Sequence, residues 1–239
     1  VSGTSISFGS RVVVNAASTS FVQPVYEPNA QKVVVAYKDN GDSGKGYAKV
    51  GTVSGTSISF GSAGLFEPGV ANDFADGVVY DPDSQKIVIG YKDEDNSNYG
   101  TAVVGTVSGT SISFGTPVVF EEANTEYVSA TYNTAVNKVV LMYEDKGNSS
   151  YLTAVVGTVS GTSISFDTPV VIKSSTATYI DSVYDSNANK HVVAFADGGN
   201  SSYGTAVTFS PSTIATTRAE VADGGNASMD IIGSVSDNQ

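Results

Sequence analysis

Two patterns of hydrophobic and polar residues alternate along this chain, and both predict β-strands. "KVVLMYED" (138–145) and "YLTAVVGTV" (151–159) are nearly continuous apolar runs, which are typical of strands covered on both faces. "TSISF" (162–166) alternates instead, with Ile164 and Phe166 on one side and polar residues on the other. This period of two indicates a half-exposed strand at the edge of a sheet.

Short polar segments separate these runs and predict tight connections. "KGNSS" (146–150) is a Gly/Asn/Ser loop, and Ser160-Gly161 is a two-residue hairpin turn. A shorter mixed run, "YVSATYN" (127–133), precedes the first apolar run. Residues 127–166 are therefore expected to form four successive antiparallel strands, the first to fourth strands of a repeat.

The same organisation recurs four times. The phrase "VSGTSISF" begins at Val1, Val53, Val107 and Val159, at spacings of 52, 54 and 52 residues. Its verbatim identity indicates recent duplication, and periods of this size are typical of propellers and other repeat arrays. Other residues follow the same period: Tyr26, Tyr80, Tyr132 and Tyr184; Lys32, Lys86, Lys138 and Lys190; Tyr37, Tyr91, Tyr143 and Phe195.

The expected fold is an all-β, four-bladed propeller with four-stranded antiparallel blades, over residues 1–209. The phrase near Val1–Val14 would supply the missing fourth strand of the last blade by pairing with Tyr203–Phe209, which would remove exposed sheet edges. Five or more blades are the alternative. Residues 210–239 leave the repeat and are expected to form a strand pair or to begin a following module.

Composition narrows the function. The chain has 239 residues with 12 basic and 24 acidic side chains, a net charge of −12. Such a surface repels phosphate backbones, so nucleic acid is not an expected partner. Without cysteine, and with His191 as its single histidine, the chain offers no thiol nucleophile and no two-histidine metal site. No apolar run reaches the roughly 18 residues of a membrane span, so membrane insertion is not expected.

The repeat resembles a known group of sequences. "VVGTVSGTSISFGTPVVF" is followed by Y-x5-KVV-x2-Y-x-D (132–145), and "GNSSY" (147–151) comes next. These motifs, with "ADGGNASMDIIGSVSDNQ" (222–239), resemble repeat arrays in predicted tail-fibre and virion-associated proteins of marine phages and marine metagenomes. The resemblance covers nearly the whole chain. It implies a fibre or adhesion role and a virion or extracellular location, and it carries over no catalytic or binding residue.

One rim of the expected blades varies most. The loops after the second strands and the connections after the fourth strands lie there, whereas the opposite rim carries the turns after the first strands and the invariant Ser-Gly turns. Variable loops on a fixed scaffold are typical of binding proteins. The candidate binding residues, including two phenylalanines expected to be exposed, are Asp39, Asp42, Asp93, Asp95, Asp145, Asp197, Phe66, Phe120, Glu121 and Glu122.

The aspartates of this rim allow two interpretations. An aspartate ends the second strand of each repeat. Its carboxylate can accept backbone N–H groups of the loop that follows. Alternatively, these carboxylates could coordinate calcium, which takes six to eight oxygen ligands, with Asp42 and Asp95 supplying more. The spacing matches no EF-hand motif. No metal site is assigned, and no cofactor is expected.

Catalysis is not expected, although one alternative uses paired carboxylates. Propeller glycosidases employ such pairs, and Asp73, Asp76, Glu126 and Asp181 fall at the beginning of the first strands. The first repeat has Ser20 and Gln23 at the matching positions, and near-identical repeats suit construction or avidity better than catalysis.

The expected function is therefore non-enzymatic. The chain is predicted to be a tail-fibre or virion-associated component, either structural or receptor-binding. Its expected partners are a host-surface glycan or protein and other fibre or virion subunits, including further copies of itself. The alternatives are a stand-alone carbohydrate-binding lectin and a glycan-cleaving enzyme.

Overall fold

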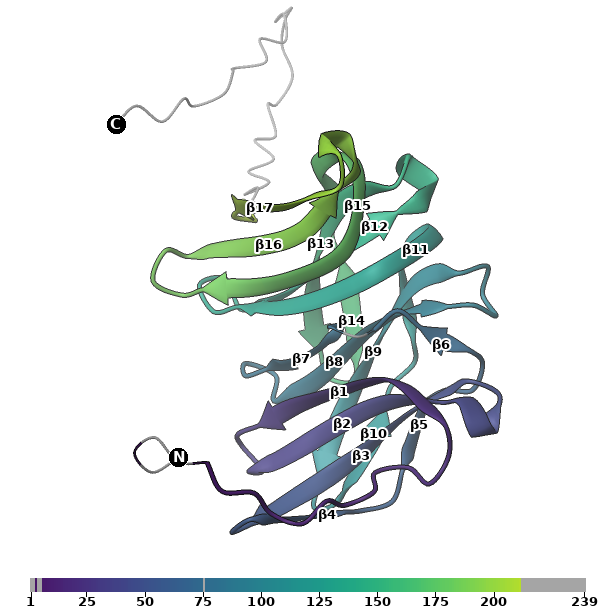
Figure 1. Ribbon diagram of the computed structural model, residues 1–239, viewed down its shortest axis with the longest axis vertical. Helices are drawn as coiled ribbons and strands as arrows, with labels where there is room; N and C mark the ends of the chain where they lie inside the picture. Colours follow the sequence, from purple (N-terminus) through teal and green to yellow (C-terminus); the bar gives the residue numbers. More distant parts are fainter. Residues whose placement is uncertain (1–2, 4–5, 75, 212–239) are drawn as a thin grey trace, which may run out of the picture.

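The computed structural model describes residues 3, 6–74 and 76–211. In these residues the regular structure is β, apart from three single-turn 3-10 helices, and the strands pair into antiparallel sheets (Figure 1). The predicted all-β class is confirmed. Within the described part of the chain, no helix has both the length and the apolar character of a membrane span.

The first repeat forms a sheet of its own. Its order is β1-β2-β3-β4, and β5 also pairs with β3. The fourth strand of the repeat is therefore split into two pieces, β4 and β5, which pair with opposite halves of β3. The bounds are β1 (Thr19–Glu27), β2 (Lys32–Asp39), β3 (Lys45–Ser54), β4 (Ser57–Phe60) and β5 (Gly64–Glu67).

The other repeats share one sheet of twelve strands, because one long strand passes from the second repeat into the third and another from the third into the fourth. The first half of β11 pairs with β9 and its second half with β12, and β15 joins β13 to β16 in the same way. Between β5 and β6 the same connection contains Pro68-Gly69, and there the sheet is interrupted. The bounds are β6 (Ala71–Asn72), β7 (Val78–Asp81), β8 (Lys86–Asp93), β9 (Tyr99–Ser108), β10 (Ser111–Phe114), β11 (Val118–Asn133), β12 (Lys138–Asp145), β13 (Tyr151–Ser160), β14 (Ser163–Phe166), β15 (Val170–Asp185), β16 (Lys190–Asp197) and β17 (Tyr203–Phe209).

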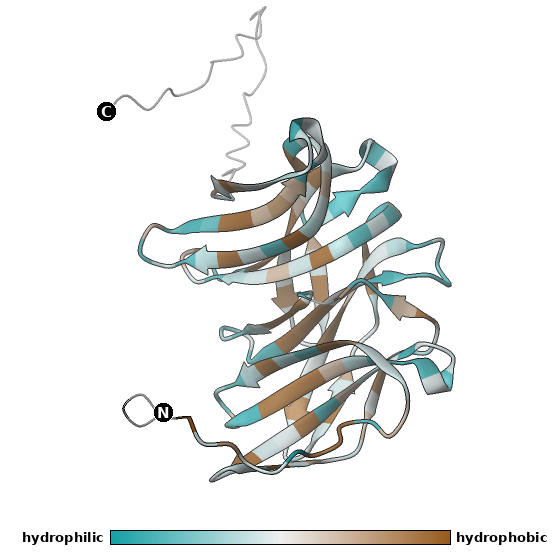
Figure 2. Ribbon diagram, viewed as in Figure 1, coloured by the Kyte–Doolittle hydropathy of each residue, from teal (hydrophilic) through white to brown (hydrophobic). Residues whose placement is uncertain are grey.

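The hydrophobic core lies between successive repeats. Val34 and Ala48 of the first repeat pack with Ile89 and Tyr91 of the second, and two similar clusters join the second to the third and the third to the fourth. Figure 2 shows the apolar residues concentrated along the central strands of the repeats. In the second and third repeats the near-continuous apolar runs therefore reflect strands that are covered on both faces, whereas β16 and β17 of the fourth repeat keep one face exposed.

The repeated phrase packs on two neighbours at once. Ile58 and Phe60 of its second copy lie over Gly51, where a Cβ atom would come within 2.9 Å of both side chains. The glycine that follows the phrase approaches the next repeat: a Cβ on Gly61 would lie 1.9 Å from the carbonyl oxygen of Thr110. Glycine is required at both positions, which provides a physical reason for identity in addition to duplication.

The predicted closure of the sheet by the N-terminal segment is wrong for the described residues. Residues 6–18 form no strand, and β17 pairs only with β16 among the described strands. Figure 1 shows β17 at the opposite end of the molecule from β4 and the N-terminal segment. That segment lies on the first repeat, where the Lys49 ammonium donates to the Val14 carbonyl oxygen at 2.6 Å.

The reason lies at Phe209. The corresponding positions in the other repeats are Gly51, Gly105 and Gly157, which leave room for the isoleucine and phenylalanine of the phrase. A phenylalanine at this position occupies that room, so a fourth strand cannot pack there as it does elsewhere. The prediction of a strand pair or a following module concerns residues 210–239, of which 212–239 lie outside the described residues.

Candidate functional site

Near the beginning of each first strand one residue leaves the ladder, at a bulge in the first, third and fourth repeats and at the break between β6 and β7 in the second. These residues have left-handed backbone angles, with φ between 50° and 54°. Such angles are uncommon for residues other than glycine, and bulges of this kind re-aim side chains. They are Phe21, Asp73, Tyr127 and Tyr179, one from each repeat at spacings of 52, 54 and 52 residues.

These four side chains meet at one cavity of about 300 Å³. The site therefore takes a residue from every repeat, although the sheet is open between β17 and the first repeat. Three side chains of the lining are aromatic and three are carboxylates. The lining residues are Phe21, Asp73, Asp76, Tyr127, Val128, Tyr179, Ile180 and Asp181.

The aromatic part of the cavity is open to solvent. Tyr127 and Tyr179 lie with ring centroids 5.4 Å apart and ring planes inclined at 51°. Tyr179 is 76% exposed, the largest exposed fraction of any tyrosine in the described residues. Phe21 is supported from behind by Phe74, which is fully buried at a centroid distance of 5.5 Å. The lining thus combines one supported ring with two rings that a ligand can reach.

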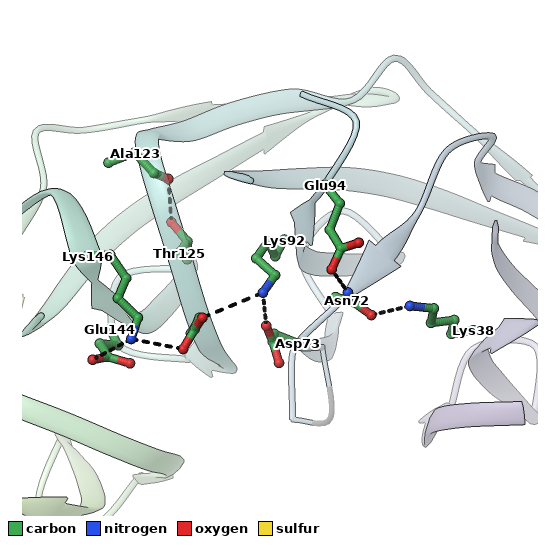
Figure 3. A network of polar contacts seen from close by, with 10 residues as sticks. Lys38, Asn72, Asp73, Lys92, Glu94, Ala123, Thr125, Glu144 and Lys146 are labelled. Atoms are coloured by element: carbon green, nitrogen blue, oxygen red, sulfur yellow. Dashed lines mark hydrogen bonds and ion pairs between the residues drawn. The ribbon is translucent and has the colours of Figure 1, made fainter. Parts of the chain in front are cut away.

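A chain of charges of alternating sign lies beside the cavity (Figure 3). Lys92 lies 2.7 Å from a carboxylate oxygen of Asp73 and 3.8 Å from one of Glu126, and Lys146 lies 3.1 Å from Glu126 and 3.4 Å from Glu144. Glu144 is fully buried, and neither of its carboxylate oxygens has a hydrogen-bond partner in the described structure. Burial raises the pKa of Glu144, and the nearby ammonium of Lys146 opposes that shift.

The carboxylates of Asp76 and Asp181 differ from that of Asp73, because neither forms an ion pair with any described residue. Burial, and then the negative charge of Asp181, raise the pKa of Asp76. Contacts between neighbouring strands hold both positions: the Ala130 amide donates to the Asp76 carbonyl oxygen at 2.8 Å, and beside Asp181 the side-chain hydroxyls of Ser129 and Ser182 lie 2.7 Å apart. The two aspartates therefore reach the cavity from strands held in place by their neighbours.

The aspartates predicted on the variable rim cap their own loops. Asp39 accepts the Gly41 amide at 2.9 Å, and Asp93 accepts the Asn96 amide at 3.1 Å. Asp145 and Asp197 do the same with Asn148 and Gly199, at 3.0 and 2.9 Å.

The other acids of that rim are either bonded locally or exposed. Asp42 accepts the Tyr47 hydroxyl at 2.6 Å and the Lys45 ammonium at 2.9 Å, and these bonds lower the pKa of Asp42. Asp95 and Glu122 are exposed. In the described ranges no three His, Cys, Asp or Glu side chains are grouped so that they could hold a metal ion.

The expectation that Phe66 and Phe120 are exposed is wrong. They are 3% and 6% exposed, because their rings fill the space left by glycines in the adjacent third strands: a Cβ on Gly46 or Gly100 would lie 2.4 Å from the corresponding ring. Glu121, another predicted binding residue, accepts the hydroxyl of Tyr143 at 2.9 Å. These side chains join neighbouring repeats.

Three aromatic residues of the cavity were missed, namely Phe21, Tyr127 and Tyr179. The signal that could have found them is positional: an aromatic residue stands at the same place in three of the four repeats. By contrast, the sequence did single out the carboxylates of this cavity, as candidates for catalysis. The structure brings Asp73, Asp76 and Asp181 together at the cavity, with Glu126 one ion pair away through Lys92.

Comparison with known proteins adds no family. No protein-family model matches the sequence, and no curated protein matches it significantly.

Proposed function

We propose that this chain is a non-enzymatic, propeller-like component of a phage tail fibre or virion, and that it binds a host-surface glycan in the cavity between its four first strands. The observation that carries the proposal is the lining of that cavity. Tyrosine and phenylalanine faces stack on pyranose rings, and carboxylates accept sugar hydroxyls. The few polar groups among apolar ones are typical of a small-molecule site.

The arrangement of the repeats also supports a propeller-like architecture. Each repeat contributes its first strand to the cavity and its middle strands to the core between repeats, and the first three repeats add a fourth strand that pairs with the third. A propeller is built from such radial units around a central channel. In this proposal the units form an open array of four, since β17 pairs only with β16 among the described strands.

Binding without catalysis is the better interpretation of the carboxylates. A glycosidase needs one carboxyl group as acid and another as nucleophile or base, in environments that separate their pKa values. Here the Lys92 ammonium lies 2.7 Å from a carboxylate oxygen of Asp73 and holds that side chain in place. The glycan-cleaving alternative rests on Asp76, whose pKa is raised by burial and then by Asp181.

A glycan array tests the proposal. The wild-type protein is expected to retain a defined set of glycans, and Tyr179→Ala is expected to lose them because the most accessible ring of the cavity is gone. The matched control is Tyr203→Ala, since Tyr203 is also an exposed tyrosine (63%) but lies outside the cavity. Equal binding by both variants would contradict the cavity as the site.

Two further measurements separate the alternatives. Incubation of retained glycans with the protein is expected to release no reducing ends, whereas release that is lost in Asp76→Asn would establish the enzyme. Antibodies against the chain are expected to label purified virions in electron micrographs. Glycan binding without virion labelling would favour a stand-alone lectin, and virion labelling without glycan binding would favour a structural role.

A further inference from the structure

The cavity carries more negative charge than its surroundings balance. Five carboxylates line or adjoin it, and the two lysines of the ion-pair chain supply the only compensation among the described ion pairs there. The formal sum is 2 − 5 = −3. No lysine, arginine or histidine is among the lining residues. The five carboxylates are Asp73, Asp76, Glu126, Glu144 and Asp181.

The aromatic side chains add to this negative potential. The face of an aromatic ring is the negative end of its quadrupole and attracts cations within about 6 Å of its centre. Tyr127 and Tyr179 stand together at the open side of the cavity, with centroids 5.4 Å apart, and Phe21 lines it as well. Rings beside carboxylates are the arrangement that recognises organic ammonium groups.

A buried acid supports this interpretation independently. Glu144 is fully inaccessible to solvent, its oxygens have no hydrogen-bond partner in the described structure, and the Lys146 ammonium is 3.4 Å away. Burial is the largest cause that raises the pKa of Tyr127, followed by Tyr179 and then by the charges of Glu126 and Glu144. The wall of the cavity that carries Tyr127 therefore has negative charge behind it.

We infer that the cavity recognises an ammonium group, and that its ligand is a sugar with a free amine. This inference rests on the proposed glycan-binding function and narrows its substrate class. The ammonium would lie between the carboxylates of Asp76 and Asp181, which lack an ion-pair partner among the described residues, while the ring stacks on Tyr179. A cavity of about 300 Å³ accommodates one such sugar unit at the small end of ligand sites.

A metal ion is the less suitable occupant. Calcium takes six to eight oxygen ligands at 2.3–2.6 Å. The faces of the three aromatic rings, which stand beside the three carboxylates of the lining, offer no such ligand. A quaternary ammonium without a sugar shares the chemistry of the charged group, so the experiment includes one as a separate ligand.

The experiment is a titration by isothermal calorimetry, at 20 mM salt, with glucosamine, glucose and choline. Glucosamine is expected to bind at least tenfold more tightly than glucose. Asp181→Asn is expected to reduce that preference to less than threefold. Asp167→Asn is the matched control, because it removes one exposed carboxylate that is not among the cavity-lining residues, and it is expected to keep the preference.

Each result decides between the two ideas. Equal affinity for glucosamine and glucose would overturn the ammonium inference and leave the glycan proposal in place. Choline binding as tight as that of glucosamine, with no binding of glucose, would support the ammonium group and overturn the sugar. Binding of none of the three ligands would overturn both for the monosaccharide class. A preference that Asp167→Asn abolishes as fully as Asp181→Asn would show general charge attraction and overturn the site.

Discussion

The ring of Phe209 stacks on the imidazole of His191, with centroids 5.1 Å apart and planes inclined at 22°. In the other repeats the same pair of positions holds an aliphatic residue opposite a glycine, as in Ile87 and Gly105. In the other repeats this space is filled by the isoleucine and phenylalanine of the repeated phrase. In the fourth repeat it is filled by Phe209, a residue of the third strand. Terminal units that differ in this way are typical of repeat proteins.

Replacing Phe209 by glycine should reopen that space. Phe209→Gly is expected to lower the free energy of unfolding by roughly 2 kcal/mol or more, since aromatic packing is lost. A synthetic peptide with the sequence VSGTSISFG should then raise the melting temperature of the variant but not of the wild-type protein, as measured by calorimetry. A peptide that stabilises both proteins equally, or neither, would contradict the role given to Phe209.

The buried histidine makes stability depend on pH. His191 accepts from the Asn133 amide at Nε2 (3.0 Å), so its Nδ1 carries the proton toward the Thr131 hydroxyl (2.9 Å). Burial lowers the pKa of His191 to about 4, below the value of 6.5 expected in the unfolded chain. The neutral form is thus favoured on folding, and the unfolded chain binds more protons between these values.

Its contribution is therefore fully present above pH 6.5 and is lost as pH falls toward 4, by up to roughly 3 kcal/mol. His191→Gln should retain an acceptor and a donor while removing the titration. The difference in unfolding free energy between wild type and variant is expected to change across this window by urea denaturation. Parallel curves from pH 7 to pH 4 would be inconsistent with a buried neutral imidazole.

A tyrosine and a glutamate join the first repeat to the second. The Tyr91 hydroxyl donates to Glu67 at 2.7 Å, and both residues are buried. Tyr91→Phe should cost about 1–3 kcal/mol because one oxygen of Glu67 loses its donor. At the junction of the third and fourth repeats these positions hold Lys173 and Phe195.

The double variant Tyr91→Phe/Glu67→Lys copies that natural pair, and should therefore be more stable than the sum of the two single effects. A double-mutant cycle in guanidinium gives the coupling. Strict additivity would indicate that the hydrogen bond contributes little.

Two glycines provide a matched test of packing in the third strands. A Cβ on Gly105 would lie 2.8 Å from the ring of Phe114. A Cβ on Gly204, which lies at a different position of its third strand, would have nothing within 4 Å. Gly105→Ala is expected to cost about 1–3 kcal/mol through overpacking. Gly204→Ala should be neutral or stabilising by up to about 1 kcal/mol, since it only restricts the unfolded chain. Equal effects in thermal unfolding would contradict the close contact of the phrase.

The sequence predicts most of the strands, because their apolar runs and turns recur with a fixed period. It does not reveal that β11 and β15 continue into the next repeat, since no glycine or proline lies within either strand. The split of the fourth strand does have a signal, because Gly61, Pro117 and Pro169 stand at the breaks. The cavity depends on bulges at Tyr127 and Tyr179, which the hydrophobic pattern does not encode. Phe66 and Phe120 were misplaced because their burial depends on glycines in another strand, at positions that a linear pattern does not connect.

The uninterrupted β11 and β15 have a mechanical consequence. Because each strand belongs to two repeats, no linker remains in which a repeat could swivel or extend before its neighbour yields. A pull on the chain would load the ladder bonds of adjoining repeats together. The interrupted connection at Pro68-Gly69 is the exception in this series, so the first repeat is expected to detach first when the molecule is stretched between its ends.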